Sequence, residues 1–161
     1  TMIFLPNETS KLSKGKIVSR IGLQAKAIIA NKDFNFVSYV SEHKTEKLSC
    51  ILIDEAQFLT KKQVRELGHI ADKLNLPVMC YGIRTDFRGE LFEGSSELLA
   101  LADNFIELKT ICSYCINKAT MVVRRNDGGK VLTEGTKVVV GGNDIYTSVC
   151  RNHFRELTKL V

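Results

Sequence analysis

The sequence predicts an α/β domain, with a mostly parallel sheet covered by helices on both faces, followed by a small strand-rich unit. Three observations predict this organisation. Short all-apolar runs, typical of strands buried on both faces, alternate with segments of helical periodicity. After Lys109, short strands and glycine turns replace that alternation. Three of the five cysteines lie in this last part, close to a histidine. We therefore expect two domains, 1–109 and 110–161.

The first elements lie before residue 31. Residues 1–5 form an apolar run that predicts a buried strand, and because the sequence opens directly on it, we expect a missing N-terminal segment. Residues 7–15 are polar and predict a loop. For residues 21–30 we expect a short helix.

A strand–helix–strand unit follows. Residues 50–53 are all apolar and predict a buried strand. Thr60 can cap a helix, and apolar residues recur at helical spacing after it until Asn75-Leu76-Pro77 ends the pattern. Residues 78–83 predict the next strand. The unit is therefore a crossover between parallel strands. A helix over 95–102 and a strand over 105–108 complete the domain.

The second domain has its own sequence of elements. Residues 120–124 predict a strand that ends in the Asp127-Gly128-Gly129 turn. A short strand is expected over 137–140 and a basic helix over 151–160. Hairpins of this kind, with little apolar content between them, predict a ribbon.

Metal-ligand spacing marks this ribbon. Cys112 and Cys115 are separated by two residues, as are Cys150 and His153. Two residues between ligands let one tight turn present both side chains to one ion, so the two pairs predict a tetrahedral Cys₃His zinc site. Four protein ligands close the coordination shell, which predicts a structural rather than a catalytic zinc.

The other two cysteines have a simpler interpretation. Cys50 and Cys80 lie inside apolar runs and are interpreted as small core residues. The odd number of cysteines excludes complete disulfide pairing within the chain, which is typical of a reducing cytoplasm.

An acidic pair ends the strand at residues 50–53. Asp54 and Glu55 follow it directly, at the strand end where α/β sheets bind ligands. The first carboxylate can hold Mg²⁺ of a bound nucleotide, and the second can take a proton from an attacking hydroxyl. With Gln57 two residues on, the pattern indicates a nucleotide site, although acids are also common at a helix N-terminus.

Charge and composition exclude several classes. The content of hydrophobic residues is 44% and that of charged residues 25%, which does not suit a disordered chain. No apolar run is long enough to cross a membrane. The net charge of +5 raises the possibility of nucleic-acid binding, but the basic residues are scattered and no aromatic residues lie among them. A solvated surface is the simpler interpretation.

Three segments together resemble the type II, bacterial-type thymidine kinases. They occur in the order and spacing of that family, and the similarity runs from Thr1 through the ribbon; the segments cover residues 53–59, 81–92 and 141–151. The resemblance implies a fold of the P-loop NTPase or RecA-like type, with a zinc-ribbon domain that carries a nucleoside-binding "lasso". It also implies phosphorylation of the 5′-hydroxyl of deoxythymidine by ATP with Mg²⁺.

The resemblance implies roles for individual residues. Glu55 is the general base, and Asp54 belongs to the magnesium and phosphate site. The nucleoside-binding residues that the resemblance implies are Gln57, Phe58, Ile83, Phe87, Phe92, Val139 and Tyr146. It further implies a cytoplasmic homotetramer, inhibited by dTTP, with no membrane or nucleic-acid partner.

Two departures from the family accompany the resemblance. The phosphate-binding pattern Gly-x-x-x-x-Gly-Lys-Ser/Thr is absent, and the family carries it before the point that matches Thr1. We expect the N-terminal strand and this loop to be missing from the sequence. The family also has an acid and an arginine soon after its second strand. Here Glu8 and Lys11 are the candidates, and a lysine cannot grip phosphate in the bidentate way of arginine.

Three alternatives stay open at this point. The Asp54-Glu55-Ala56-Gln57 string also resembles helicases, but a helicase needs two such domains and has no place for the ribbon. A zinc-ribbon module that binds nucleic acid would use the basic charge, although no aromatic platform accompanies Arg124, Arg125 and Lys130. An inactive relative of the kinases is the third.

Overall fold

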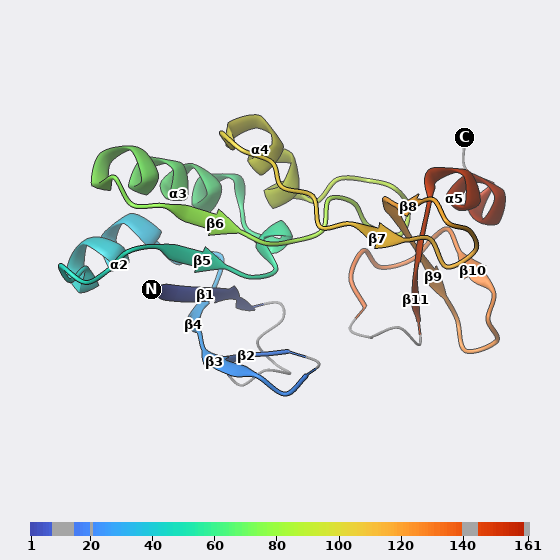
Figure 1. Cartoon of the computed structure of the whole chain (residues 1–161), viewed down its shortest axis with the longest axis horizontal. Helices are drawn as coiled ribbons and strands as arrows, with labels where there is room; N and C mark the ends of the chain where they lie inside the picture. The colour runs from blue at the N-terminus through green and yellow to red at the C-terminus, as the bar shows by residue number, and fades with distance from the viewer. Residues whose placement is uncertain (8–14, 20, 140–144, 160–161) are drawn as a thin grey trace. The chain divides into compact units, whose positions relative to one another are not determined.

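The computed structural model describes residues 1–7, 15–19, 21–139 and 145–159, which form two compact units (Figure 1). The first unit comprises Thr1–Arg84 and Phe92–Asp103, and the second Thr85–Leu91 and Asn104–Val161. From Asn104 onward the chain stays in the second unit, so the expected domain boundary after Lys109 lies shortly beyond this point. The short segment Thr85–Leu91 belongs to the second unit although first-unit residues flank it in sequence.

The first unit is built on a four-stranded parallel sheet. Its strand order is β4-β1-β5-β6, and each neighbouring pair is parallel. The predicted strands at 1–5 and 50–53 are confirmed, and the one at 78–83 is shorter than expected. The strands are β1 (Met2–Pro6), β4 (Ile28–Ala30), β5 (Ile51–Ile53) and β6 (Val78–Cys80). The sheet therefore confirms the α/β class.

The helix expected over 21–30 is wrong. Gln24–Lys26 forms β3, which pairs antiparallel with β2 (Lys16–Val18). Ile28–Ala30 forms β4, in which Ile28 pairs with Phe4 of β1. The β-branched Ile28 and Ile29 fit a pleated strand, and pairing with β1 satisfies backbone groups that a weakly amphipathic helix would expose to water.

Three helices pack with this sheet. They are α2 (Phe36–His43), α3 (Lys61–Leu74) and α4 (Glu93–Leu101), and α3 contacts both of the others. The predicted helices at 60–74 and 95–102 are confirmed. The sequence analysis missed α2, which begins where the Asn35 side chain accepts the Ser38 N–H at 2.8 Å. No helix in the described residues is both long and apolar enough to cross a membrane.

The start of α3 is fixed by a reciprocal pair of hydrogen bonds. Thr60 Oγ1 accepts the Gln63 N–H at 3.2 Å, and Gln63 Oε1 accepts the Thr60 N–H at 3.0 Å. We expect Thr60→Ala to lower the free energy of unfolding by about 1 kcal/mol, because one helix N–H loses its acceptor. Urea denaturation followed by circular dichroism would measure the change. Thr45→Ala, at an exposed turn, is the control, and an equal loss there would refute the assignment.

The core of the first unit lies between the sheet and the helices α2 and α3. Phe4, Phe36, Ile51, Ile53 and Ile70 are completely buried in it. The prediction of Cys80 as a core residue is confirmed, since it packs against this cluster and burial raises the pKa of its thiol to about 12. The thiol therefore stays protonated at neutral pH. A rigid core under β5 and β6 holds the carboxyl ends of both strands in place.

The second unit is a ribbon. Its main sheet has the order β10-β9-β11, and a second antiparallel pair and a C-terminal helix complete it. The strand and turn predicted at 120–124 and 127–129 and the C-terminal helix are confirmed. The elements are β7 (Thr110–Ile111), β8 (Lys118–Ala119), β9 (Met121–Arg125), β10 (Val131–Leu132), β11 (Tyr146–Val149) and α5 (Arg151–Thr158).

Two predicted strands are not found. Residues 105–108 form no strand, and Phe105 and Ile106 are 62% and 87% exposed, because the apolar run pairs with no other strand in the described part of the chain. Residues 137–139 also lack strand pairing there, and residue 140 lies outside the described residues. Apolar character alone therefore did not identify strands, which need a partner for their backbone groups.

Candidate active site and metal centre

The acidic pair lies at the carboxyl end of β5. The strand ends at Ile53, and Glu55 adopts a left-handed backbone conformation with φ 53° and ψ 38°. Its N–H donates to Asp54 Oδ1 at 3.0 Å, and the next residue, Ala56, donates its N–H to Tyr81 O at 2.8 Å. A non-glycine residue in this region costs about 1–3 kcal/mol. The surrounding contacts therefore hold the Glu55 carboxylate in a conformation that the isolated chain would avoid.

Gln57 holds the Glu55 carboxylate through a hydrogen bond. It is 2% exposed, and its Nε2 donates to Glu55 Oε2 at 2.5 Å. Its Oε1 accepts the Ile83 N–H at 3.2 Å. At Gly82 a Cβ atom would lie 2.5 Å from this Oε1 and 3.1 Å from the Gln57 backbone nitrogen, so a larger residue there would displace the amide. Both the nitrogen and the oxygen of the Gln57 side-chain amide are thus hydrogen-bonded within the protein. Substrate binding by Gln57 stays a prediction.

Three of the predicted pocket residues belong to the first unit. The rings of Phe58 and Phe92 meet edge to face, with centroids 5.6 Å apart. Ile83 is 51% exposed, and its carbonyl accepts a hydrogen bond from Ser95 Oγ at 2.7 Å. The structure therefore brings Phe58 and Phe92 together and fixes the backbone at Ile83.

The other three belong to the second unit. Phe87 is 1% exposed and lies under the guanidinium of Arg124, whose Cζ is 3.8 Å from the ring centroid. The Tyr146 hydroxyl donates to the Val139 carbonyl at 2.9 Å. The structure therefore brings Val139 and Tyr146 together, and residues 140–144 between them lie outside the described residues. Lys11 and Glu8 also lie outside them.

Sequence reasoning named Arg124 only as a cation of a possible nucleic-acid-binding ribbon and did not expect it to be buried. The structure buries it on β9, with 4% exposure. Alternation along β9 puts Arg124 on the same face as Val122, but no signal in the sequence identified that face as buried.

The four predicted zinc ligands form one cluster. The ligand atoms of Cys112, Cys115, Cys150 and His153 all lie within 4.8 Å of one another. The Sγ atoms of Cys115 and Cys150 are 3.9 Å apart, and His153 Nδ1 is 3.3 Å from Cys150 Sγ. Tetrahedral zinc with ordinary bond lengths requires edges of roughly 3.8 Å between sulfurs and roughly 3.6 Å between sulfur and nitrogen. The cluster therefore fits a zinc ion.

The surroundings favour the ligand form of Cys112. Burial raises the pKa of its thiol. The backbone N–H groups of Cys150 and Tyr114 and the neighbouring thiols lower it by more than burial raises it, so that the pKa falls from an ordinary 9.0 to about 6. A thiolate is the form that binds metal. On the far side of the histidine ring, Glu156 Oε2 lies 3.9 Å from His153 Nε2, where a carboxylate can orient a metal-bound imidazole.

Comparisons with known proteins agree with these observations. A family model described as thymidine kinase matches residues 1–154. The thymidine kinase of Aliivibrio fischeri is 52% identical over 155 residues, which cover 96% of this chain and 80% of that protein. Those of Shewanella oneidensis and Haemophilus influenzae are each 50% identical over 157 residues, 97% of this chain and 81% of theirs.

Proposed function

The chain belongs to the thymidine kinase family, and from this we propose that it transfers the terminal phosphoryl group of ATP to the 5′-hydroxyl of deoxythymidine. The products are ADP and deoxythymidine 5′-monophosphate. The observation that carries the proposal is the acidic turn after β5, where Gln57 and a left-handed backbone hold the Glu55 carboxylate in one orientation.

Glu55 acts as the general base in this proposal. It accepts the proton of the 5′-hydroxyl as the oxygen attacks the phosphorus atom, and the bond from that phosphorus to the bridging oxygen of ADP breaks. Phosphoryl transfer depends on alignment and charge neutralisation more than on covalent help, so a carboxylate fixed by its neighbours suits the reaction. A base contributes when it is held within hydrogen-bonding distance of the proton.

Asp54 and Lys11 serve the phosphate end. The Asp54 carboxylate at the end of β5 offers the hard oxygen ligand that Mg²⁺ prefers, and Mg²⁺ bound with ATP would neutralise charge on the phosphates. Lys11 supplies a positive charge for the same groups.

The nucleoside end uses apolar surface and backbone groups. The proposed nucleoside-binding residues are Phe58, Ile83 and Phe92 in the first unit and Phe87, Val139 and Tyr146 in the second. Stacking and apolar contact bind the planar base, and main-chain groups of the loop read its edge. The contact between Tyr146 and Val139 supports this assignment, because it ties together the two ends of the loop.

Zinc has a structural role in the proposal. Three cysteines and one histidine supply four protein ligands, which leaves no open position for water or substrate. Zinc binding would hold the strand β11 and the hairpin β7–β8 in the arrangement that the ribbon needs.

Further properties follow the family resemblance. We propose a homotetramer in the cytoplasm that is inhibited by dTTP and has neither a membrane nor a nucleic-acid partner. The scattered basic residues favour the absence of a nucleic-acid partner, because such an interface needs a continuous basic surface.

A phosphorylation assay on the full-length gene product tests the proposal. The assay would contain ATP, Mg²⁺ and deoxythymidine, with deoxycytidine and deoxyadenosine as competitors. We expect deoxythymidine to be phosphorylated, and deoxycytidine and deoxyadenosine not to be phosphorylated. Absence of activity in protein that is folded and carries zinc would instead identify an inactive relative of the family.

Gln57→Glu tests how the base is held. The new carboxylate would lie beside Glu55 Oε2, and two adjacent carboxylates cannot both ionise easily, so the apparent pKa of the pair rises. The base must be ionised to work. We therefore expect the acid limb of the kcat–pH profile to move to higher pH by about 1–2 units. The shift is measured with steady-state kinetics between pH 5 and 9.

Gln24→Glu is the matched control, since Gln24 is exposed on β3. Its profile should stay that of the unmodified protein. An unmoved acid limb in Gln57→Glu would show that Gln57 does not orient the base.

A further inference from the structure

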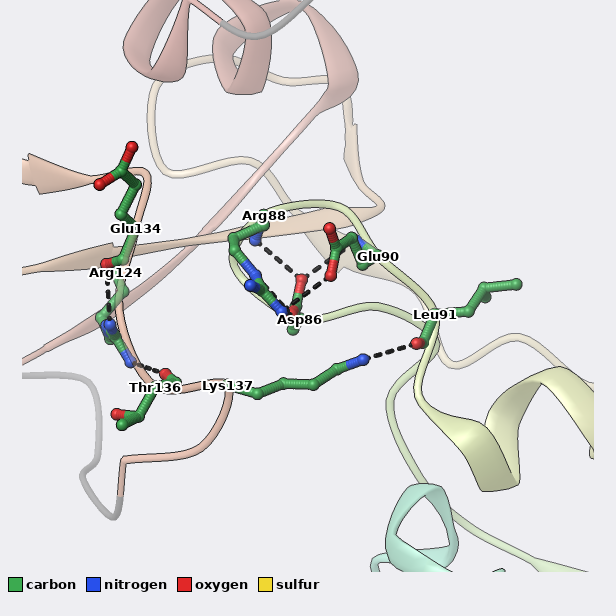
Figure 2. A network of polar contacts seen from close by, with 8 residues as sticks. All are labelled: Asp86, Arg88, Glu90, Leu91, Arg124, Glu134, Thr136 and Lys137. Atoms are coloured by element: carbon green, nitrogen blue, oxygen red, sulfur yellow. Dashed lines mark hydrogen bonds and ion pairs between the residues drawn. The ribbon is translucent and has the colours of Figure 1, made fainter. Parts of the chain in front are cut away.

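Arg124 occupies an unusual position for a charged residue. Its side chain is 4% exposed, and on β9 it lies opposite Tyr146 of β11. Its Nη1 donates to the Thr136 carbonyl at 2.7 Å and its Nη2 to the Glu134 carbonyl at 3.3 Å (Figure 2). The guanidinium also covers the ring of Phe87. In the described part of the chain, its partners are thus backbone carbonyls and an aromatic face, and Nε has no hydrogen-bond partner there.

Burying a charged side chain costs free energy unless its hydrogen-bond partners stay in place. A buried charge loses its hydration, and hydrogen bonds to a charged group recover more of that loss than neutral ones do. The planar guanidinium can donate to two carbonyls while its face stacks on a ring, which a lysine cannot do. Arg124 therefore links two segments, Thr85–Leu91 and residues 134–139, to the strand β9.

The first of these segments is Thr85–Leu91, which contains Phe87. It closes on itself, because Thr85 and Leu91 form a β-bridge. Asp86, 2% exposed, accepts the N–H groups of Arg88 and Glu90 at 2.9 and 3.0 Å. Its other oxygen pairs with the Arg88 guanidinium at 3.0 Å (Figure 2). These bonds order the loop locally, and the contact of Phe87 with Arg124 joins the loop to β9.

The second segment comprises residues 134–139 and precedes the loop between Val139 and Tyr146. Arg124 holds it at Glu134 and Thr136, and Lys137 Nζ donates to the Leu91 carbonyl at 2.7 Å (Figure 2). Gly135 has a φ of +118°, and a Cβ there would lie 2.7 Å from Arg124 Nη2. Only glycine lets the chain pass the guanidinium in this conformation. The segment ends at Val139, which the hydroxyl of Tyr146 holds.

From these contacts we infer that Arg124 is a positioning residue for nucleoside binding. It fixes Phe87 from one side and the stem of the loop between Val139 and Tyr146 from the other, without touching the substrate. This inference rests on the proposed function for its consequence in catalysis. Its structural part, the linkage of the two segments through one side chain, is independent of that function.

Arg124→Met tests the inference, since methionine fills a similar volume without donors. Hydrogen–deuterium exchange should rise about 10-fold or more at the amides of 85–91 and 134–139, while those of α5 and the zinc content stay unchanged. KM for deoxythymidine should rise about 10-fold, with KM for ATP unchanged and kcat within about threefold. Arg125→Met is the matched control, because Arg125 is the next residue on β9 and its guanidinium bonds Gly129 O and the Tyr114 hydroxyl instead.

Gly135→Ala gives a second variant that leaves Arg124 in place. Its added methyl would press on the guanidinium and strain the backbone, so the same two segments should exchange faster. This variant decides the question if Arg124→Met does not fold. Unchanged exchange in both segments and an unchanged KM would overturn the inference. Inactivity of the unmodified protein would refute the proposed function, whereas the exchange comparison would still decide whether Arg124 links the segments.

Discussion

Glu55→Gln is expected to lower kcat by about 10²- to 10⁴-fold while deoxythymidine still binds. The amide has nearly the size of the carboxylate, and its oxygen can still accept the hydrogen bond from Gln57 Nε2. The left-handed backbone at Glu55 does not depend on the charge. What the variant loses is the ability to take the proton of the 5′-hydroxyl. The loss should therefore appear in kcat and not in nucleoside affinity.

The measurement combines steady-state kinetics with calorimetric titration of deoxythymidine. Glu46→Gln makes the same chemical change at an exposed turn and should leave both quantities unchanged. A kcat within threefold of the unmodified value would remove Glu55 from the mechanism. A parallel loss of nucleoside binding would instead mean that the carboxylate contacts the ground state of the substrate, and the role of base would have to be reassigned.

Local signals in the sequence predicted much of the first unit. The strands β1 and β5 are short apolar runs, and the start of α3 follows from Thr60, whose capping bond needs no distant partner. The errors arose where a distant partner decides. Ile28 and Ile29 became a strand because the edge of β1 was free to pair with them. At Phe105–Leu108 the reverse occurred, since an apolar run found no partner strand in the described residues.

The candidate site divides in the same way. Ligand spacing predicted the metal cluster, because two residues between ligands fix the local geometry of each pair. The acidic pair followed from its place after an apolar strand. The sequence did not reveal that Gln57 holds Glu55, that Gly82 makes room for its amide, or that Arg124 lies against Phe87. The contacts of Gly82 with Gln57 and of Arg124 with Phe87 join segments far apart in the chain, which sequence periodicity does not indicate. The hydrogen bond between Gln57 and Glu55 is local, but it depends on the left-handed backbone at Glu55, which the sequence did not predict.

The largest effect on stability is expected for Cys112→Ser. Two of the five buried residues at the centre of the second unit are themselves ligands, Cys112 and Cys150, and the others are Val123, Val149 and Phe154. So small an apolar core cannot offset the conformational entropy of ordering the ribbon. Structural zinc contributes about 10–16 kcal/mol in small zinc-dependent domains. Removing one thiolate should therefore unfold the second unit along with the loss of metal.

Metal analysis and hydrogen–deuterium exchange would measure both consequences in one preparation. We expect zinc to fall from one ion per chain to near zero, and the amides of β9, β11 and α5 to lose their protection. The core of the first unit contains no ligand, so the amides of α3 should stay protected. Cys50→Ser replaces a thiol outside the cluster and should keep its zinc. A full zinc complement in Cys112→Ser, with β9 still protected, would contradict both the ligand assignment and the argument that metal replaces a core.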